Sequence, residues 1–122
     1  MDMQQAHKML EPRLATHVFV GFVLKRVQAE GGFATILQKG DATSGTVLLI
    51  CLERGDNPRV LEKRLGYDSP PKWERIWPKN GGKPLSLDEY LERRTKSDPD
   101  LWLVELDIPD AERLADEILL NA

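Results

Sequence analysis

Residues 33–54 read FATILQKGDATSGTVLLICLER, and this stretch does most to set the fold. Two short runs rich in strand-forming apolar residues, 33–39 and 46–54, flank a turn-forming segment that begins at Gly40 and ends at Gly45. Such runs on either side of a glycine-bounded loop are typical of a β-hairpin. We therefore predict two adjacent antiparallel strands joined by residues 40–45, called the Gly40–Gly45 loop below.

Helices and further strands are predicted on both sides of this hairpin. Residues 14–30 place apolar side chains at helical spacing and end at two glycines, which predicts a helix, although strand-forming residues at 17–20 leave an extended first turn open. Ser86 and Glu89 form a capping box that begins another helix. The downstream elements are expected in this order: strands over residues 59–65 and 72–77, a helix over 86–97, a strand over 101–106 and a last helix that begins near residue 110.

This order of elements indicates an α+β fold. Helix, strands, helix, strand and helix predict a mostly antiparallel sheet of about four to five strands with helices packed on one face. Residues 13–122 are expected to form this single domain, and residues 1–12 a frayed N-terminal segment, because they are mainly polar and precede Pro12 and the first helix.

Composition and charge describe a small globular protein. The chain has 122 residues, 41% apolar and 30% charged, with a net charge of −3, which argues against a dedicated nucleic-acid binder. Its one cysteine, Cys51, excludes an intrachain disulfide and fits a reducing compartment. The N-terminus lacks a signal-peptide pattern, and no apolar run is long enough to cross a bilayer. We expect a cytoplasmic protein that does not bind membranes.

The sequence contains no motif with a defined catalytic or cofactor-binding chemistry. Glycine-rich phosphate loops and paired Cys or His ligands for zinc are missing. Cys51, His17 and Asp41 could form a nucleophile, base and orienting group, but Cys51 lies within an apolar strand, the setting of an unreactive buried thiol. Asp98 and Asp100 offer too few oxygens for a calcium loop. We assign no catalytic residue, cofactor or metal.

The segment between residues 59 and 83 is the strongest candidate for a binding surface. An extended strand over residues 72–77 would project Trp73, Arg75 and Trp77 from one face, where a cation between two indoles could grip a partner. The alternative is that both indoles fill the core while the Arg75 stem packs between them. Basic and aromatic residues of this segment are Arg59, Lys63, Arg64, Tyr67, Lys72, Trp73, Arg75, Trp77, Lys79 and Lys83.

Three stretches carry a resemblance to a known family. Residues 33–49, the pair Trp73-Glu74, and residues 98–105, which read DPDLWLVE, resemble a family of small alphaproteobacterial proteins of unknown function. The resemblance spans about residues 13–107 and implies a bacterial, cytoplasmic, stand-alone domain without assigned activity, cofactor or partner. The acidic helix expected after Asp107 departs from the short basic ending of that family.

Two classes of function follow from these observations. The first is a non-catalytic binding or adaptor module whose candidate surface is Trp73, Arg75, Trp77, Arg64 and Lys72. Its expected partner is a protein; nucleic acid is disfavoured by the net negative charge, and two copies of the chain could pair as a homodimer. The second is a small enzyme or accessory subunit with a site near the Gly40–Gly45 loop and Cys51.

Overall fold

The computed structural model describes residues 14–65, 68–79 and 85–121. The segment predicted to fray, residues 1–12, lies outside these ranges, as do Tyr67 and Lys83 of the basic and aromatic segment 59–83. Within them the chain forms three helices and five strands, in the order α2 (Thr16–Ala29), β1 (Phe33–Gln38), β2 (Val47–Glu53), β3 (Asp56–Arg64), β4 (Lys72–Trp77), α3 (Leu87–Ser97), β5 (Trp102–Asp107) and α4 (Ala111–Asn121).

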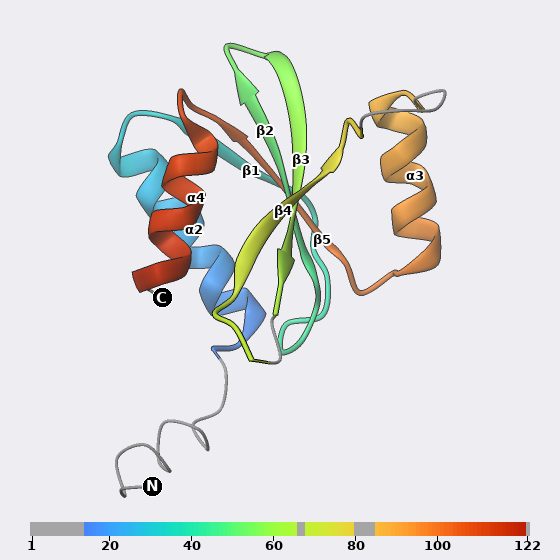
Figure 1. Ribbon diagram of the computed structural model, residues 1–122, viewed down its shortest axis with the longest axis horizontal. Helices are drawn as coiled ribbons and strands as arrows, with labels where there is room; N and C mark the ends of the chain where they lie inside the picture. The colour runs from blue at the N-terminus through green and yellow to red at the C-terminus, as the bar shows by residue number, and fades with distance from the viewer. Residues whose placement is uncertain (1–13, 66–67, 80–84, 122) are drawn as a thin grey trace, which may run out of the picture.

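The predicted fold class is confirmed. The five strands form one mixed, mostly antiparallel sheet in the order β1-β5-β2-β3-β4, and Figure 1 shows the helices arranged around it. The predicted capping box is also present, because the Ser86 hydroxyl accepts the backbone N–H of Glu89 at 3.1 Å and donates to the Glu89 carboxylate at 3.0 Å. No helix in the described ranges is long and apolar enough to cross a membrane.

The predicted hairpin between β1 and β2 is wrong. β5 lies between these two strands, antiparallel to β1 and parallel to β2. The Gly40–Gly45 loop therefore crosses the start of β5 instead of making a tight turn: the Asp41 N–H donates to the Asp100 carbonyl at 2.9 Å, and the Trp102 N–H donates to the Thr46 carbonyl at 2.8 Å. Because β5 lies inside the sheet, its side chains are buried on both faces. A two-stranded hairpin of β1 and β2 would bury less apolar surface.

The prediction that all helices cover one face of the sheet is also wrong. α2 and α4 cover one face, and α3 lies against the other (Figure 1). The reason is that both faces are apolar: successive residues of β2, such as Leu48 and Leu49, are buried in two different core clusters. The second cluster is closed by Leu87, Tyr90 and Leu91 of α3.

Candidate interaction surface on strand β4

The two tryptophans of β4 point to opposite faces of the sheet. Trp73 packs with the α2 and α4 cluster, whereas Trp77 packs with the α3 cluster. A β-bulge separates them: Arg75 pairs with Leu61 and Trp77 with the adjacent Val60, which leaves Ile76 as the extra residue. The predicted platform of Trp73, Arg75 and Trp77 on one face is therefore wrong, because the bulge turns Trp77 to the other side.

Both indoles have structural partners. The Trp73 Nε1–H donates to the Ala115 carbonyl of α4 at 2.9 Å, and the Trp73 ring lies 6.0 Å from that of Phe19. The Trp77 Nε1–H donates to the Leu85 carbonyl just before α3, at 3.0 Å. Both side chains are half-buried, and each indole anchors one helix to the edge of the sheet. This arrangement is closer to the alternative in which both indoles pack in the core than to an exposed binding platform.

Two basic residues of the candidate segment are neutralised by carboxylates. Arg59 is buried and donates through Nε to the Glu112 carboxylate of α4 at 2.7 Å. This hydrogen bond holds the pKa of the Glu112 carboxyl below its usual value. Arg64 forms ion pairs at 2.7 Å with both Glu62 and Glu74. Arg59 therefore fixes α4 to the sheet and is not available to a partner.

The buried carboxylate Glu62 ties α3 to the sheet. It pairs with Arg64 from its own strand and with Arg94 from α3, and Arg94 also donates to the Tyr90 hydroxyl at 3.1 Å. The sequence analysis missed Glu62 and Arg94. The one signal for them was a glutamate directly after the apolar pair Val60 and Leu61 of β3, at a buried position that needs a cationic partner.

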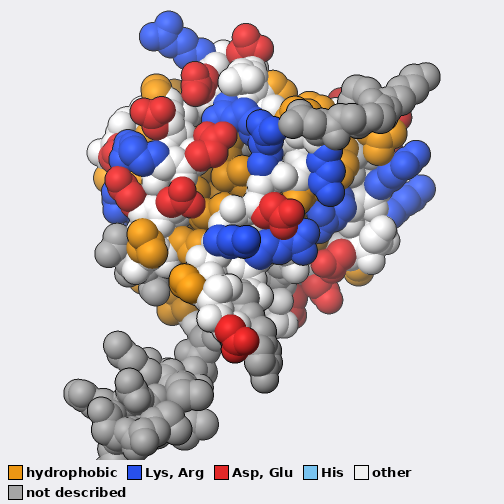
Figure 2. Space-filling view, in the orientation of Figure 1, with side chains coloured by type: hydrophobic (Ala, Val, Ile, Leu, Met, Phe, Trp, Pro, Cys, Tyr) orange, Lys and Arg blue, Asp and Glu red, His pale blue; other side chains and the backbone are white. Residues whose placement is uncertain are grey.

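Lys72 and Arg75 remain exposed on β4, which is an edge strand of the sheet. Neither forms an ion pair within 4.0 Å with a residue that the structure describes, and they project to opposite faces because they are three positions apart. Figure 2 shows lysine and arginine side chains gathered over β3 and β4. Of the predicted residues, Lys72 and Arg75 lie exposed on the edge strand β4, on opposite faces, and Arg64 lies on the neighbouring strand β3 on the same face as Lys72.

The Gly40–Gly45 loop was the candidate site of the second hypothesis, that of a small enzyme or accessory subunit. In the structure its hydrogen bonds stabilise the fold. The carbonyls of Ala42 and Thr43 accept the first backbone N–H groups of α2, at 2.9 and 3.1 Å, and so cap that helix. The Asp41 carboxylate accepts hydrogen bonds from Ser44 and Thr43, which hold its pKa below the usual value. The carbonyl of Asp41 accepts the indole N–H of the buried Trp102 at 2.7 Å.

A pocket of about 280 Å³ lies beside this loop. Lys63 is the one charged side chain among the described residues that line it, and its Nζ lies 3.9 Å from the centre of the Phe19 ring. The lining residues are Leu14, Thr16, Thr43, Ser44, Gly45, Thr46, Val47, Lys63 and Leu65. Cys51 is not among them, because it lies four residues from Val47 along β2, about 13 Å away at the rise of a strand.

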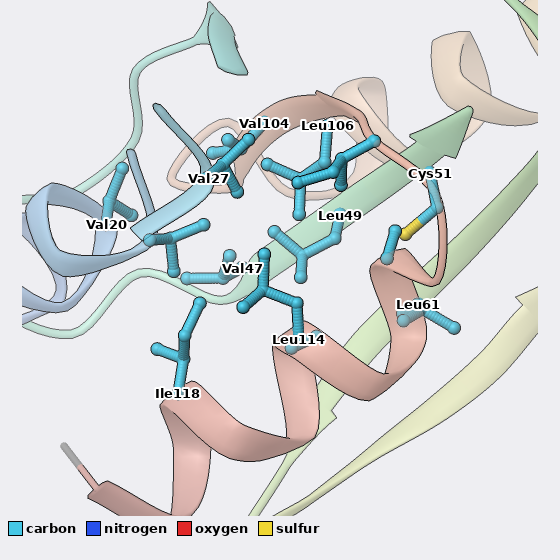
Figure 3. Packing of buried hydrophobic residues seen from close by; sticks show 14 of the residues in the cluster. Val20, Val27, Val47, Leu49, Cys51, Leu61, Val104, Leu106, Leu114 and Ile118 are labelled. Carbon is cyan, nitrogen blue, oxygen red and sulfur yellow. The ribbon is translucent and has the colours of Figure 1, made fainter. Parts of the chain in front are cut away.

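Cys51 is a core residue. It is fully buried, and Figure 3 shows it among the apolar side chains beside the start of α4. Burial raises the pKa of the Cys51 thiol to about 12, with a smaller contribution from the Glu112 carboxylate. A thiol that is neutral and shielded from solvent cannot serve as the nucleophile that the alternative hypothesis considered.

The Cys51 thiol is expected to resist alkylation in the native protein. At pH 8 iodoacetamide should modify it at least about a hundredfold more slowly than in the urea-unfolded chain, because the folded state holds the thiol protonated and covered. Mass spectrometry of timed samples measures both rates. Similar rates in the two states would contradict the buried position.

The fold and this surface define a class of protein: a small α+β domain with helices on both faces of a mixed sheet and a charged edge strand. The chain belongs to the DUF1491 family, whose model, described as "Protein of unknown function (DUF1491)", matches residues 14–116. This match confirms the resemblance drawn from residues 33–49, 73–74 and 98–105. It also extends over about the first half of α4, the part of the chain where a departure from the family was expected.

Solved structures agree with this assignment. A crystal structure of a DUF1491 family protein from Caulobacter crescentus matches at 31% identity and a TM-score of 0.67, over 80% of this chain and 91% of that one. An NMR structure of a DUF1491 family protein from the same organism matches at 32% identity and 0.65, over 80% and 88%. A protein from A. tumefaciens, at 24% identity, 0.64, and 80% and 88% coverage, shares the fold. No curated protein matches this sequence.

Proposed function

We propose that this protein is a non-catalytic binding module that docks an acidic segment of a partner protein as an added strand along β4. The observation that carries the proposal is the position of Lys72 and Arg75: both are exposed, on opposite faces of a strand that ends the strand order among the described residues. An added strand would hydrogen-bond to the outer backbone groups of β4. Its alternating side chains would meet Arg75 on one face and Lys72 on the other.

The charge of β4 favours an acidic partner strand over other ligands. Lysine and arginine on an edge strand repel a second copy of the same edge, which is how soluble proteins protect such edges from self-association. The same charges attract a strand that carries glutamate or aspartate. A nucleic acid is a weaker candidate, because an added strand pairs through backbone N–H and C=O groups, which a nucleic acid lacks.

Selection of short random peptides by phage display against the whole protein tests the proposal. The enriched peptides should be acidic and strand-forming, and the double variant Lys72→Glu with Arg75→Glu should weaken their binding about tenfold or more. A matched control, Lys25→Glu with Lys96→Glu, reverses two exposed charges on α2 and α3 and should bind as the wild type does.

Two outcomes would contradict this function. Enrichment of neutral or basic peptides, or equal binding of acidic peptides by the Lys72 and Arg75 double variant, would remove β4 as the docking site. Salt-sensitive binding of a single-stranded oligonucleotide that is tighter than that of any selected peptide would replace the protein partner with nucleic acid. Chemical-shift changes in NMR spectra locate the contact in every case.

A further inference from the structure

The pocket of about 280 Å³ beside the Gly40–Gly45 loop, called the Lys63 pocket below, is not used by the docking surface on β4. Its described lining comes from the beginning of α2, from residues 43–47 and from the end of β3. The volume lies near the lower end of the roughly 300–1,000 Å³ that is typical of pockets for small molecules. The chemistry of the lining residues indicates which kind of small molecule fits.

The Lys63 pocket contains a cationic group that is partly shielded from water. Lys63 is half-buried, and its Nζ lies 3.9 Å from the centre of the ring of Phe19, a buried residue. An ammonium group held against a buried ring attracts an anion more strongly than one surrounded by water. No aspartate or glutamate is among the described residues that line the pocket. The carboxylate of the adjoining loop, Asp41, accepts hydrogen bonds from within that loop. The pocket therefore favours a ligand with a negative charge.

Hydroxyl groups that can donate to such a ligand belong to the same lining. The Thr16 hydroxyl donates to loop carbonyls, and the Ser44 hydroxyl donates to the Asp41 carboxylate. The hydroxyls of Thr43 and Thr46 form no hydrogen bond with a residue that the structure describes. A carboxylate accepts several hydrogen bonds through its two oxygens, so two hydroxyl donors and one ammonium group match its requirements.

The apolar part of the lining favours a ligand with a hydrocarbon body. Leu14 is 42% exposed and Leu65 is 51% exposed, and both line the pocket together with Val47. A ligand that covers these side chains removes apolar surface from water, which an inorganic anion does not do. Since a cavity of about 150 Å³ holds a benzene molecule, the Lys63 pocket has room for about ten non-hydrogen atoms.

We propose that the Lys63 pocket binds a small organic carboxylate, in which one carboxylate group is joined to an apolar ring or chain. The Lys63 ammonium pairs with the carboxylate, and the hydroxyls of Thr43 and Thr46 donate hydrogen bonds to it. A single ammonium group balances a single negative charge, so a carboxylate fits better than a phosphate, for which proteins usually provide arginine or several donors. The site lies on the α2 side of the sheet and does not depend on the docking of a partner at β4.

Titration of the full-length protein with benzoate, followed by two-dimensional NMR, tests the proposal. Benzoate should bind saturably with a dissociation constant of about 1 mM or lower, and the largest chemical-shift changes should fall on residues 43–47 and 63–65. Benzamide has nearly the same shape without the charge, whereas acetate and inorganic phosphate have the charge without the ring. Each of these three should bind about tenfold or more weakly than benzoate.

Variants of the polar lining test the two kinds of contact. Lys63→Met keeps a side chain of similar length and removes its charge, so it should weaken benzoate binding about tenfold or more and leave benzamide binding unchanged. Lys25→Met, at an exposed position on α2, is the matched control and should bind benzoate as the wild type does. The double variant Thr43→Val with Thr46→Val keeps the ammonium group and should weaken benzoate binding about fivefold, with little change in melting temperature.

Three results would overturn the proposal. The first is the absence of saturable shift changes at residues 43–47 and 63–65. The second is binding of benzamide, acetate or phosphate as tight as that of benzoate, because the site would then not recognise an apolar carboxylate. The third is wild-type affinity for benzoate in folded Lys63→Met. If Lys63→Met does not fold, the double threonine variant takes its place, and wild-type affinity in that variant would overturn the proposal in the same way.

Discussion

Replacement of Gly40 by alanine is expected to destabilise the protein by at least about 3 kcal/mol and to leave much of it unfolded at 37 °C. A Cβ atom at this position would lie 2.1 Å from the carbonyl oxygen of Asp100 and 2.7 Å from the carbonyl carbon of Leu101. Both are backbone atoms at the start of the central strand β5, so neither can move aside without breaking the pairing that follows. Urea denaturation followed by circular dichroism measures the loss.

Gly21→Ala is the matched control for this prediction. Gly21 lies within α2 and has no atom within 4 Å of an added Cβ. Alanine should stabilise α2 by about 0.5–1 kcal/mol, because glycine loses more backbone freedom than alanine when a helix forms. The same substitution thus has opposite signs at two positions, and a Gly40→Ala protein as stable as the wild type would contradict the close approach of the loop to β5.

The second large effect is expected at Trp102. Its side chain is 2% exposed, and its Nε1–H donates to the Asp41 carbonyl at 2.7 Å. Trp102→Ala should cost about 3–5 kcal/mol, since it leaves a cavity under the Gly40–Gly45 loop and removes the hydrogen bond. Thermal and urea unfolding measure this cost.

Trp102→Phe separates the two contributions. It keeps most of the ring packing and removes the indole N–H, so its cost should be smaller, about 1–3 kcal/mol. Equal costs for the alanine and phenylalanine variants would show that the hydrogen bond, and not the packing, carries the effect. A cost below about 1 kcal/mol for Trp102→Ala would contradict the buried position. The Gly40 and Trp102 predictions test the same contact, which is the one between the Gly40–Gly45 loop and the start of β5.

The locally encoded features were predicted well from the sequence. The strand-forming runs became β1 and β2, and the capping box at Ser86 and Glu89 begins α3 as expected. Periodicity and caps depend on residues within a few positions of each other, and so the sequence pattern alone indicates them. Gly40 and Gly45 were recognised as the bounds of a turn-forming segment, whereas the structure needs glycine there because Asp100 approaches both closely.

The arrangement of the candidate residues in space was predicted only in part. Lys72 and Arg75 are exposed as a binding surface requires, but Trp77 lies on the opposite face from Trp73. Alternation along a strand predicts which side chains share a face only while the strand is regular, and nothing in residues 72–77 signals the bulge at Ile76. Nor did the sequence show that Arg59 would be buried and paired, because its partner Glu112 is 53 positions away in the sequence.

The sequence by itself thus determined the elements, their order, the α+β class and the family. The tertiary structure decided that β5 enters between β1 and β2, that α3 covers the second face, and which of the sheet's edges is basic and which is apolar. Helices and strands follow from short-range periodicity, which a sequence displays directly. Strand order, bulges and buried ion pairs depend on contacts between residues far apart in the chain. These contacts contribute free energy only in the folded state and leave no local pattern in the sequence.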